Sequence, residues 1–229
     1  MVAMRIPITK YSLPQVLVFP AIIIAAMAIL FWIGKTHWAI IAAQVVLAII
    51  LIFVLSFFRD PYRQIPEDKT LLLSPADGTI ADIEVIDEKE VIAAKTLRVG
   101  IFLSVFNVHI NRSPCDVKIE KIRHKKGGFK DARDPSAGTF NESNDLFLVR
   151  KNAPFDKLIV RQISGAIARR IVCKAKQGGE LAGGEQFGMI KFGSRTELYL
   201  PAGQGVKCLV KLGDKVKAGL TPLVKYEKQ

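Results

Sequence analysis

The sequence has few cysteines, and they show no pairing pattern. Cys115, Cys173 and Cys208 are far apart and lack the C-x₂-C spacing that a zinc site uses. An odd number of widely spaced thiols also argues against a disulfide framework. We therefore expect reduced, mostly buried thiols of a cytoplasmic protein, and the pattern gives no reason to expect a metal.

Charge is missing from two long stretches near the start of the chain. No Asp, Glu, Lys or Arg occurs in residues 11–34 or 36–58. Each run exceeds the roughly 20 residues that a helix needs to cross the hydrocarbon core. A signal peptide would have a shorter apolar part, of about 7–15 residues, ending at a cleavage site; a buried hairpin of a soluble protein is the other alternative. We predict a two-helix transmembrane hairpin over residues 13–58, with its link near residues 34–37.

The basic residues around this hairpin indicate its orientation. Two of them precede it and two follow it, whereas the link carries only Lys35. Lysine and arginine are retained on the cytoplasmic side of a membrane. We therefore predict a cytoplasmic N-terminal segment, residues 1–12, and a domain at residues 59–229 on the cytoplasmic side of the cell membrane.

The chain as a whole is strongly basic, with a net charge of +12 and a pI near 9.7. A basic domain held at a membrane is attracted to anionic headgroups by about 1 kcal/mol per nearby Lys or Arg. Nucleic acid is the other common partner of such charge, but no nucleic-acid-binding motif accompanies it. We predict an anionic membrane surface as a partner and no nucleic acid; an ordinary solvated basic surface is the alternative.

Long helical periodicity is missing after residue 58. Short stretches rich in Val and Ile alternate with Gly, Asp and Pro, which is typical of an all-β domain. The stretches "SPADGTI" (74–80) and "VKLGDKVKAGLTPLV" (210–224) resemble the turn-and-strand units of barrel-sandwich folds. We predict a mainly β, barrel-sandwich-like domain over residues 59–229, with a long polar loop at residues 127–145.

The stretch "MIKFGSRTELYLP" (189–201) alternates like a strand but places Gly193 and Ser194, two weak strand formers, in its middle. Glycine inside a strand marks a bulge, a bend or a close approach. Because glycine has no Cβ, the Ser194 hydroxyl could attack the Gly193 carbonyl and convert the amide into an ester. β-Elimination and loss of ammonia would then give an N-terminal pyruvoyl group. A simple turn is the alternative, and a serine-hydrolase elbow does not fit because F-G-S-R-T is not G-x-S-x-G.

A longer region carries a family resemblance. The stretch "GAIARRIVCKAKQGGELAGGEQFGMIKFGSRTELYLP" (165–201), with "SPADGTI" and "FNVHINRSP" (106–114), closely resembles the short bacterial and archaeal phosphatidylserine decarboxylase proenzymes. The resemblance extends through nearly the whole soluble domain in the expected order. It implies a lyase of phospholipid biosynthesis that converts phosphatidylserine to phosphatidylethanolamine and CO₂ without a metal or diffusible cofactor.

The resemblance also implies a zymogen. Autocatalytic cleavage between Gly193 and Ser194 would give a β chain (1–193) and an α chain (194–229), which remain partners. Ser194 would become the pyruvoyl group that forms a Schiff base with the substrate amine.

The same resemblance assigns catalytic roles to two further residues. His109 in "FNVHINRSP" would transfer protons, and Asp77 in "SPADGTI" would orient or charge-stabilise the groups that deprotonate Ser194. Without it, these residues would be a core histidine and a turn former. Longer family members have two histidines three apart, whereas this chain has His109 and Arg112. Whether His109 serves self-cleavage, decarboxylation or both therefore stays open.

Guanidinium groups match carboxylate and phosphodiester oxygens in a planar fork. Candidates for substrate binding are Arg112, Arg169, Arg170 and Arg195, with Arg112 first because it shares the His109 loop. Ordinary surface charge is the alternative for each.

Two functions without chemistry compete with the enzyme. They are a membrane-anchored barrel-sandwich adaptor and a module that binds anionic lipid headgroups. A denaturing gel would separate them from the enzyme, which alone yields two fragments. Homo-oligomer formation stays open.

Overall fold

The computed structural model describes most of the chain, namely residues 7–34, 37–134, 136–166, 170–191, 193–203 and 205–227. The chain forms two compact units, Met1–Tyr62 and Arg63–Gln229.

The first unit contains two apolar helices, α1 (Leu13–Ile33) and α2 (Trp38–Phe57), preceded by the short 3₁₀ helix η1 (Lys10–Ser12). The Gln44 amide donates a hydrogen bond to the Met27 carbonyl oxygen at 2.7 Å and so links the two helices. Apolar side chains cover every side of both helices, and almost none of either is buried within the protein. Helices of this length and composition are compatible with membrane association.

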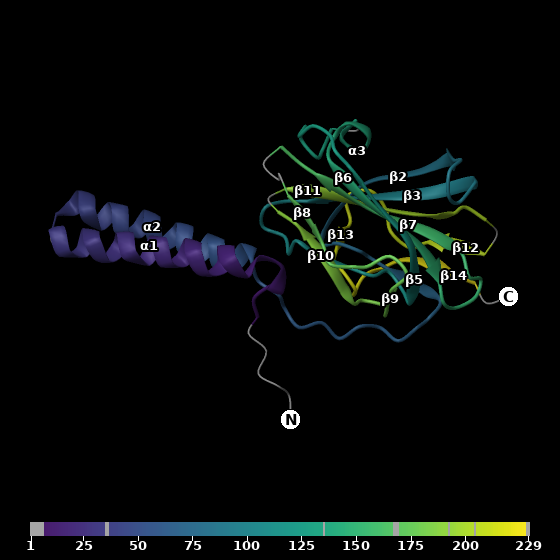
Figure 1. Cartoon of the computed structure of the whole chain (residues 1–229), viewed down its shortest axis with the longest axis horizontal. Coiled ribbons are helices and arrows are strands. Elements are labelled where there is room, and N and C mark those ends of the chain that lie inside the picture. The colour runs from purple at the N-terminus through teal and green to yellow at the C-terminus, as the bar shows by residue number, and fades with distance from the viewer. Residues whose placement is uncertain are drawn as a thin grey trace, which may run out of the picture. The chain divides into compact units, whose positions relative to one another are not determined.

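The second unit is built almost entirely of strands, as the alternation predicts (Figure 1). They are β1 (Leu71–Leu73), β2 (Gly78–Glu88), β3 (Ala94–Leu103), β4 (Ile110–Arg112), β5 (Val117–Lys125), β6 (Ser143–Arg150), β7 (Lys157–Ser164), β8 (Ile171–Cys173), β9 (Glu180–Leu181), β10 (Gln186–Ile190), β11 (Ser194–Pro201), β12 (Val206–Cys208), β13 (Lys215–Val216) and β14 (Pro222–Tyr226). The prediction of a mainly β fold is confirmed.

The predicted polar loop is slightly shorter than expected. It ends where β6 begins at Ser143, and it contains one helical turn, α3 (Ala137–Phe140). Gly138 of this turn approaches the Glu197 carboxylate, so the loop packs on the sheet and forms part of the fold.

The strands pair antiparallel in three sheets. The largest has the order β13-β2-β3-β11-β7-β6-β5-β9, and the two smaller ones have the orders β1-β14-β12 and β4-β10-β8. Because β13 and β9 lie at opposite edges of its order, the large sheet is open. This arrangement is compatible with a barrel-sandwich type of fold.

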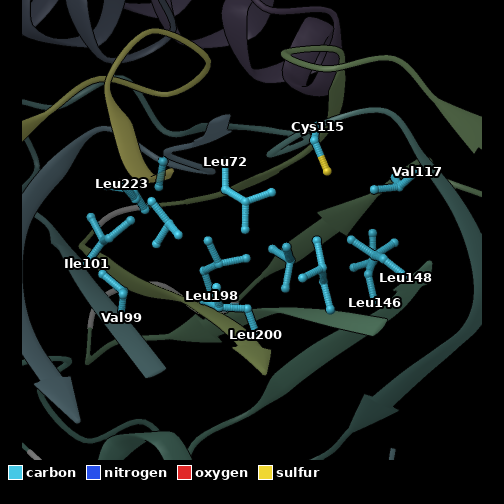
Figure 2. Close-up of a cluster of buried hydrophobic side chains, with 14 of the residues drawn as sticks. Leu72, Val99, Ile101, Cys115, Val117, Leu146, Leu148, Leu198, Leu200 and Leu223 are labelled. Atoms are coloured by element: carbon cyan, nitrogen blue, oxygen red, sulfur yellow. The ribbon is translucent and has the colours of Figure 1, made fainter. Parts of the chain in front are cut away.

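The hydrophobic core lies against the inner face of the large sheet. Period-2 alternation directs Leu198 and Leu200 of β11 to the same face, where they meet Val99 of β3 and Leu72 of β1 (Figure 2). Each such side chain, when fully buried, contributes about 1.5–3 kcal/mol of hydrophobic free energy. This packing holds β11 in a single register.

All three cysteines are free thiols, but only Cys115 is buried. Burial raises the pKa of the Cys115 thiol to about 12, so it stays protonated at neutral pH. Cys173 and Cys208 are half-buried, so the expectation of mostly buried thiols is met only at Cys115.

We expect a chain that lacks residues 1–58 to fold. The second unit begins at Arg63, so this deletion removes none of its strands or core residues. Far-UV circular dichroism should show a β spectrum and a cooperative melt at a temperature close to that of the full chain in detergent. Loss of the cooperative melt would show that the hairpin is needed for the β unit to fold.

Candidate active site

Gly193 and Ser194 lie where the chain passes between two sheets. β10 ends at Ile190 in a three-stranded sheet, and β11 begins at Ser194 in the eight-stranded sheet. The expectation that the pair interrupts one continuous strand is therefore wrong. Gly193 has φ +65°, in the left-handed region that costs an L-residue roughly 1 kcal/mol or more. The glycine allows the bend between the sheets.

The carbonyl group of Gly193 packs directly against Gly165, the residue after β7. A Cβ atom at residue 165 would lie 2.4 Å from the Gly193 carbonyl oxygen and 3.1 Å from its carbon. No side chain fits there, so glycine at 165 allows this close backbone approach.

Ser194 is the first residue of β11 and is completely buried. It lies opposite Leu103 of β3 and Ser164 of β7. Its Oγ has no hydrogen-bond partner among the residues that the structure describes. A buried hydroxyl without a partner costs about 1–3 kcal/mol and calls for an explanation. Here the hydroxyl belongs to the residue that follows the left-handed glycine.

His109 contacts the peptide that precedes this serine. Its ring is buried, and Nδ1 lies 2.9 Å from the Asn107 carbonyl oxygen. Since a carbonyl only accepts, Nδ1 carries the proton and Nε2 is the unprotonated, accepting nitrogen. Nε2 accepts the Gly193 N–H at 3.3 Å. The structure thus brings together His109 and Gly193, which are far apart in the sequence.

The turn that orients His109 was missed by sequence reasoning. The Asn107 side-chain oxygen accepts hydrogen bonds from the Ser104 N–H at 2.9 Å and the Ser104 hydroxyl at 2.8 Å. This Asx-type turn holds the Asn107 carbonyl under the imidazole. An asparagine at the end of an apolar run was the only available signal.

Asp77 makes its hydrogen bonds elsewhere. Its carboxylate accepts hydrogen bonds from both terminal nitrogens of Arg63, at 2.6 and 2.9 Å, and from the Ala218 N–H at 2.8 Å. Arg63 also donates to the Ala218 carbonyl oxygen at 2.5 Å. Asp77 therefore joins the start of the β unit to the loop after β13. The group that orients the His109 ring is the Asn107 carbonyl and not the Asp77 carboxylate. No motif in the sequence predicts that Arg63 and Asp77 pair.

The candidate arginines occupy different environments. Arg112 is buried, and its Nη1 donates to the Gly184 carbonyl oxygen at 2.9 Å. Arg170 is exposed, and Arg169 lies outside the described residues. Burial, together with the charge of Arg170, lowers the pKa of Lys191, three residues before Ser194. Lys191 and Arg170 thus form a positively charged pair beside the reactive bond.

Arg195 lies on the opposite face of the sheet from Ser194, because successive residues of a strand alternate. Its guanidinium forms ion pairs with Asp82 and Glu197, and the Nε–Glu197 distance is 2.8 Å. Its charge is therefore balanced within the protein.

A buried amide network supports the inner face next to Ser194. Gln162 donates to the Asn111 oxygen at 2.9 Å, and the Asn111 nitrogen donates to the Thr196 hydroxyl at 3.0 Å. Asn144 extends the network by donating to Gln162 at 3.0 Å. Sequence reasoning missed these residues, although polar residues at inward positions of β7 and β11 could have indicated them.

Comparison with known proteins identifies the family. The phosphatidylserine decarboxylase family profile matches residues 50–223. The chain belongs to the phosphatidylserine decarboxylase family. The predicted enzyme class, a carboxy-lyase made as a proenzyme, is confirmed with it.

Curated relatives named phosphatidylserine decarboxylase proenzyme cover most of the chain. The protein from Rhodopirellula baltica is 36% identical over 97% of this chain and 89% of its own length. The one from Symbiobacterium thermophilum is 43% identical over 81% and 83%. The one from Parabacteroides distasonis is 40% identical over 79% and 80%.

We expect Gly165→Ala to displace the Gly193 carbonyl, because the added methyl would meet backbone atoms that cannot move independently. The variant should unfold at a temperature several degrees below that of the wild type, because overpacking costs about 1–3 kcal/mol of unfolding free energy. Gly203→Ala is the matched control, since nothing lies within 4 Å of a Cβ there. Equal melting temperatures for the two variants would contradict the close approach.

Proposed function

We propose that the chain cleaves itself between Gly193 and Ser194 and then uses residue 194 to decarboxylate phosphatidylserine. One observation carries this proposal. The buried Ser194 hydroxyl, which has no hydrogen-bond partner among the described residues, directly follows Gly193, whose N–H donates to the unprotonated Nε2 of His109. Nucleophile, target carbonyl and base thus belong to one small, dry region.

The first step of self-cleavage is an N-to-O acyl shift. A bond forms between the Ser194 Oγ and the Gly193 carbonyl carbon, and His109 Nε2 takes the hydroxyl proton. The bond from this carbon to the Ser194 nitrogen then breaks, and His109 returns the proton to that nitrogen, leaving an ester. The left-handed bend at Gly193 supports this step because it holds the peptide away from regular strand geometry.

Residue 194 fits a covalent pyruvoyl group, because it starts a strand, is buried and follows the bond that breaks. That group supplies a carbonyl electron sink for loss of CO₂. The other residues bind and orient the substrate. Lys191 and Arg170 provide positive charge for the phosphate or carboxylate. Arg112, at the end of β4 shortly after His109, donates to the Gly184 carbonyl oxygen. Arg195 has a structural part in this proposal, since Asp82 and Glu197 already balance its charge.

The two apolar helices anchor the enzyme in the cell membrane, where its substrate is. Basic residues on both sides of the hairpin support a cytoplasmic position for the β unit, and the net charge of +12 favours an anionic surface.

We expect Ser194→Ala to give an intact, folded and inactive precursor, because the attacking oxygen is gone. Ser194→Cys should cleave slowly, since a thiol can make the same acyl shift. A denaturing gel distinguishes one chain of 25.3 kDa from two fragments cut after residue 193. Normal two-fragment processing of the alanine variant would disprove the cleavage site.

His109→Ala should slow self-cleavage by about 100-fold or more, the usual contribution of a general base. Wild-type and variant precursors made by cell-free synthesis can be followed on gels over time. If the variant splits normally but releases no labelled CO₂ from phosphatidylserine, His109 acts on the substrate and not in cleavage.

Asp77→Asn tests a positioning role against a catalytic one, and Arg63→Gln is its matched partner. Both changes break the same ion pair, so a positioning role predicts a similar slowing of cleavage in both, together with a lower melting temperature. If Asp77→Asn stays uncut while Arg63→Gln processes normally, the Asp77 carboxylate itself takes part in proton removal.

A further inference from the structure

Two buried hydroxyl groups face each other at the start of β11. Ser194 and Ser164 are both fully buried, and neither Oγ has a hydrogen-bond partner within the described part of the chain. They are directly opposite residues of the β11–β7 pair, so their side chains share the inner face of the sheet. The proposed mechanism uses only one of these hydroxyls.

The register places the two side chains at a narrow point of the ladder. The Ser164 N–H donates to the Glu142 carbonyl oxygen at 2.9 Å, and the Ser164 carbonyl accepts from the Asn141 amide at 2.7 Å. The backbone groups of Ser164 therefore point away from β11. This makes Ser164 and Ser194 a non-hydrogen-bonded pair, the kind in which Cα atoms are about 4.5 Å apart and side chains are closest.

The reactive carbonyl lies at the same place. The Gly193 carbonyl carbon and oxygen pack on Gly165, the neighbour of Ser164. The hydroxyl that attacks, the carbonyl that is attacked and the second hydroxyl are therefore gathered around the end of β7. Leaving two adjacent hydroxyls without partners is costly, and cross-strand serines ordinarily bond to each other.

We propose that Ser164 is a positioning residue for self-cleavage. When the two side chains rotate toward each other, the Ser164 hydroxyl donates a hydrogen bond to the Ser194 Oγ. The Ser194 proton then stays directed at His109, and a second Ser194 lone pair faces the Gly193 carbonyl carbon. When the Oγ–carbon bond forms and the carbon–nitrogen bond breaks, the Ser194 proton passes to His109 and then to the departing nitrogen. Ser164 gains and loses no proton overall. This inference rests on the proposed cleavage at Ser194.

The test follows full-length precursors made by cell-free synthesis in detergent, on denaturing gels over time. Ser164→Ala should process at least about tenfold more slowly, because the variant lacks one hydrogen bond to the reacting group. Ser164→Thr, which keeps the hydroxyl, should stay within about threefold of wild type. Ser143→Ala is the matched control, a buried serine on the neighbouring strand β6 and on the opposite sheet face, and should process normally.

Neutral hydroxylamine, which cleaves esters, identifies the slowed step. A Ser164→Ala precursor with a slow acyl shift contains little ester, so hydroxylamine should not speed its cleavage, whereas wild type should be cut faster. Thermal melts show whether Ser164→Ala is folded. The melt of Ser194→Ala, measured separately, is the reference for a folded, uncut precursor.

Three results would overturn the proposal. They are normal processing of a folded Ser164→Ala chain, equal slowing in Ser164→Ala and Ser143→Ala, and rapid hydroxylamine cleavage of Ser164→Ala. Failure of the underlying cleavage site would look different, because Ser194→Ala would then be cut as well.

Discussion

The pairing of β11 between β3 and β7 determines where the reactive bond lies. At one end of β11, Leu198 and Leu200 are fully buried in the core; at the other, Ser194 lies on the same inner face. A one-residue slip would turn every inward side chain outward and place these leucines among the buried charges of the outer face. Apolar packing at one end of the strand thus fixes the position of the nucleophile at its other end.

Charges on the outer face of the sheet fix the same register. Arg195 pairs with Glu197 and Asp82, and Glu197 also accepts the hydroxyl hydrogen of Tyr199. Burial raises the pKa of Tyr199, which keeps this hydroxyl protonated. Removing one partner of such a buried pair typically costs about 3–5 kcal/mol. These pairs on the outer face hold rigid the strand that carries Ser194 on its inner face.

The sequence predicted the elements better than their meeting points. Uncharged runs and period-2 alternation were sufficient for the apolar hairpin and the mainly β unit. The alternation did not reveal that β10 and β11 belong to different sheets, because both strands alternate and only residues 191–193 separate them. Gly193 in the sequence predicts a local bend, and the structure has one. Which two sheets this bend connects depends on long-range strand pairing.

The site shows the same division. Ser194 and His109 could be named from motifs, since the residue types suit the chemistry. Their partners could not be, because the Asn107 carbonyl is a backbone group and Ser164 reaches Ser194 only through the strand register. The sequence shows which side chains are present. The positions of backbone acceptors and the identities of cross-strand neighbours are determined only by folding.

The topology also explains how a chain can be cut here and keep its site. The segment after Gly193 contributes β11, β13 and β14, which pair with β3 and β7, with β2, and with β1 from the segment before the cut. Leu198 and Leu223 of the later segment pack in one core with Val99 of the earlier one. Breaking the proposed peptide bond would remove none of these pairings, so both fragments would stay associated. A new terminus at residue 194 would then remain on β11, next to the residue whose N–H donates to His109.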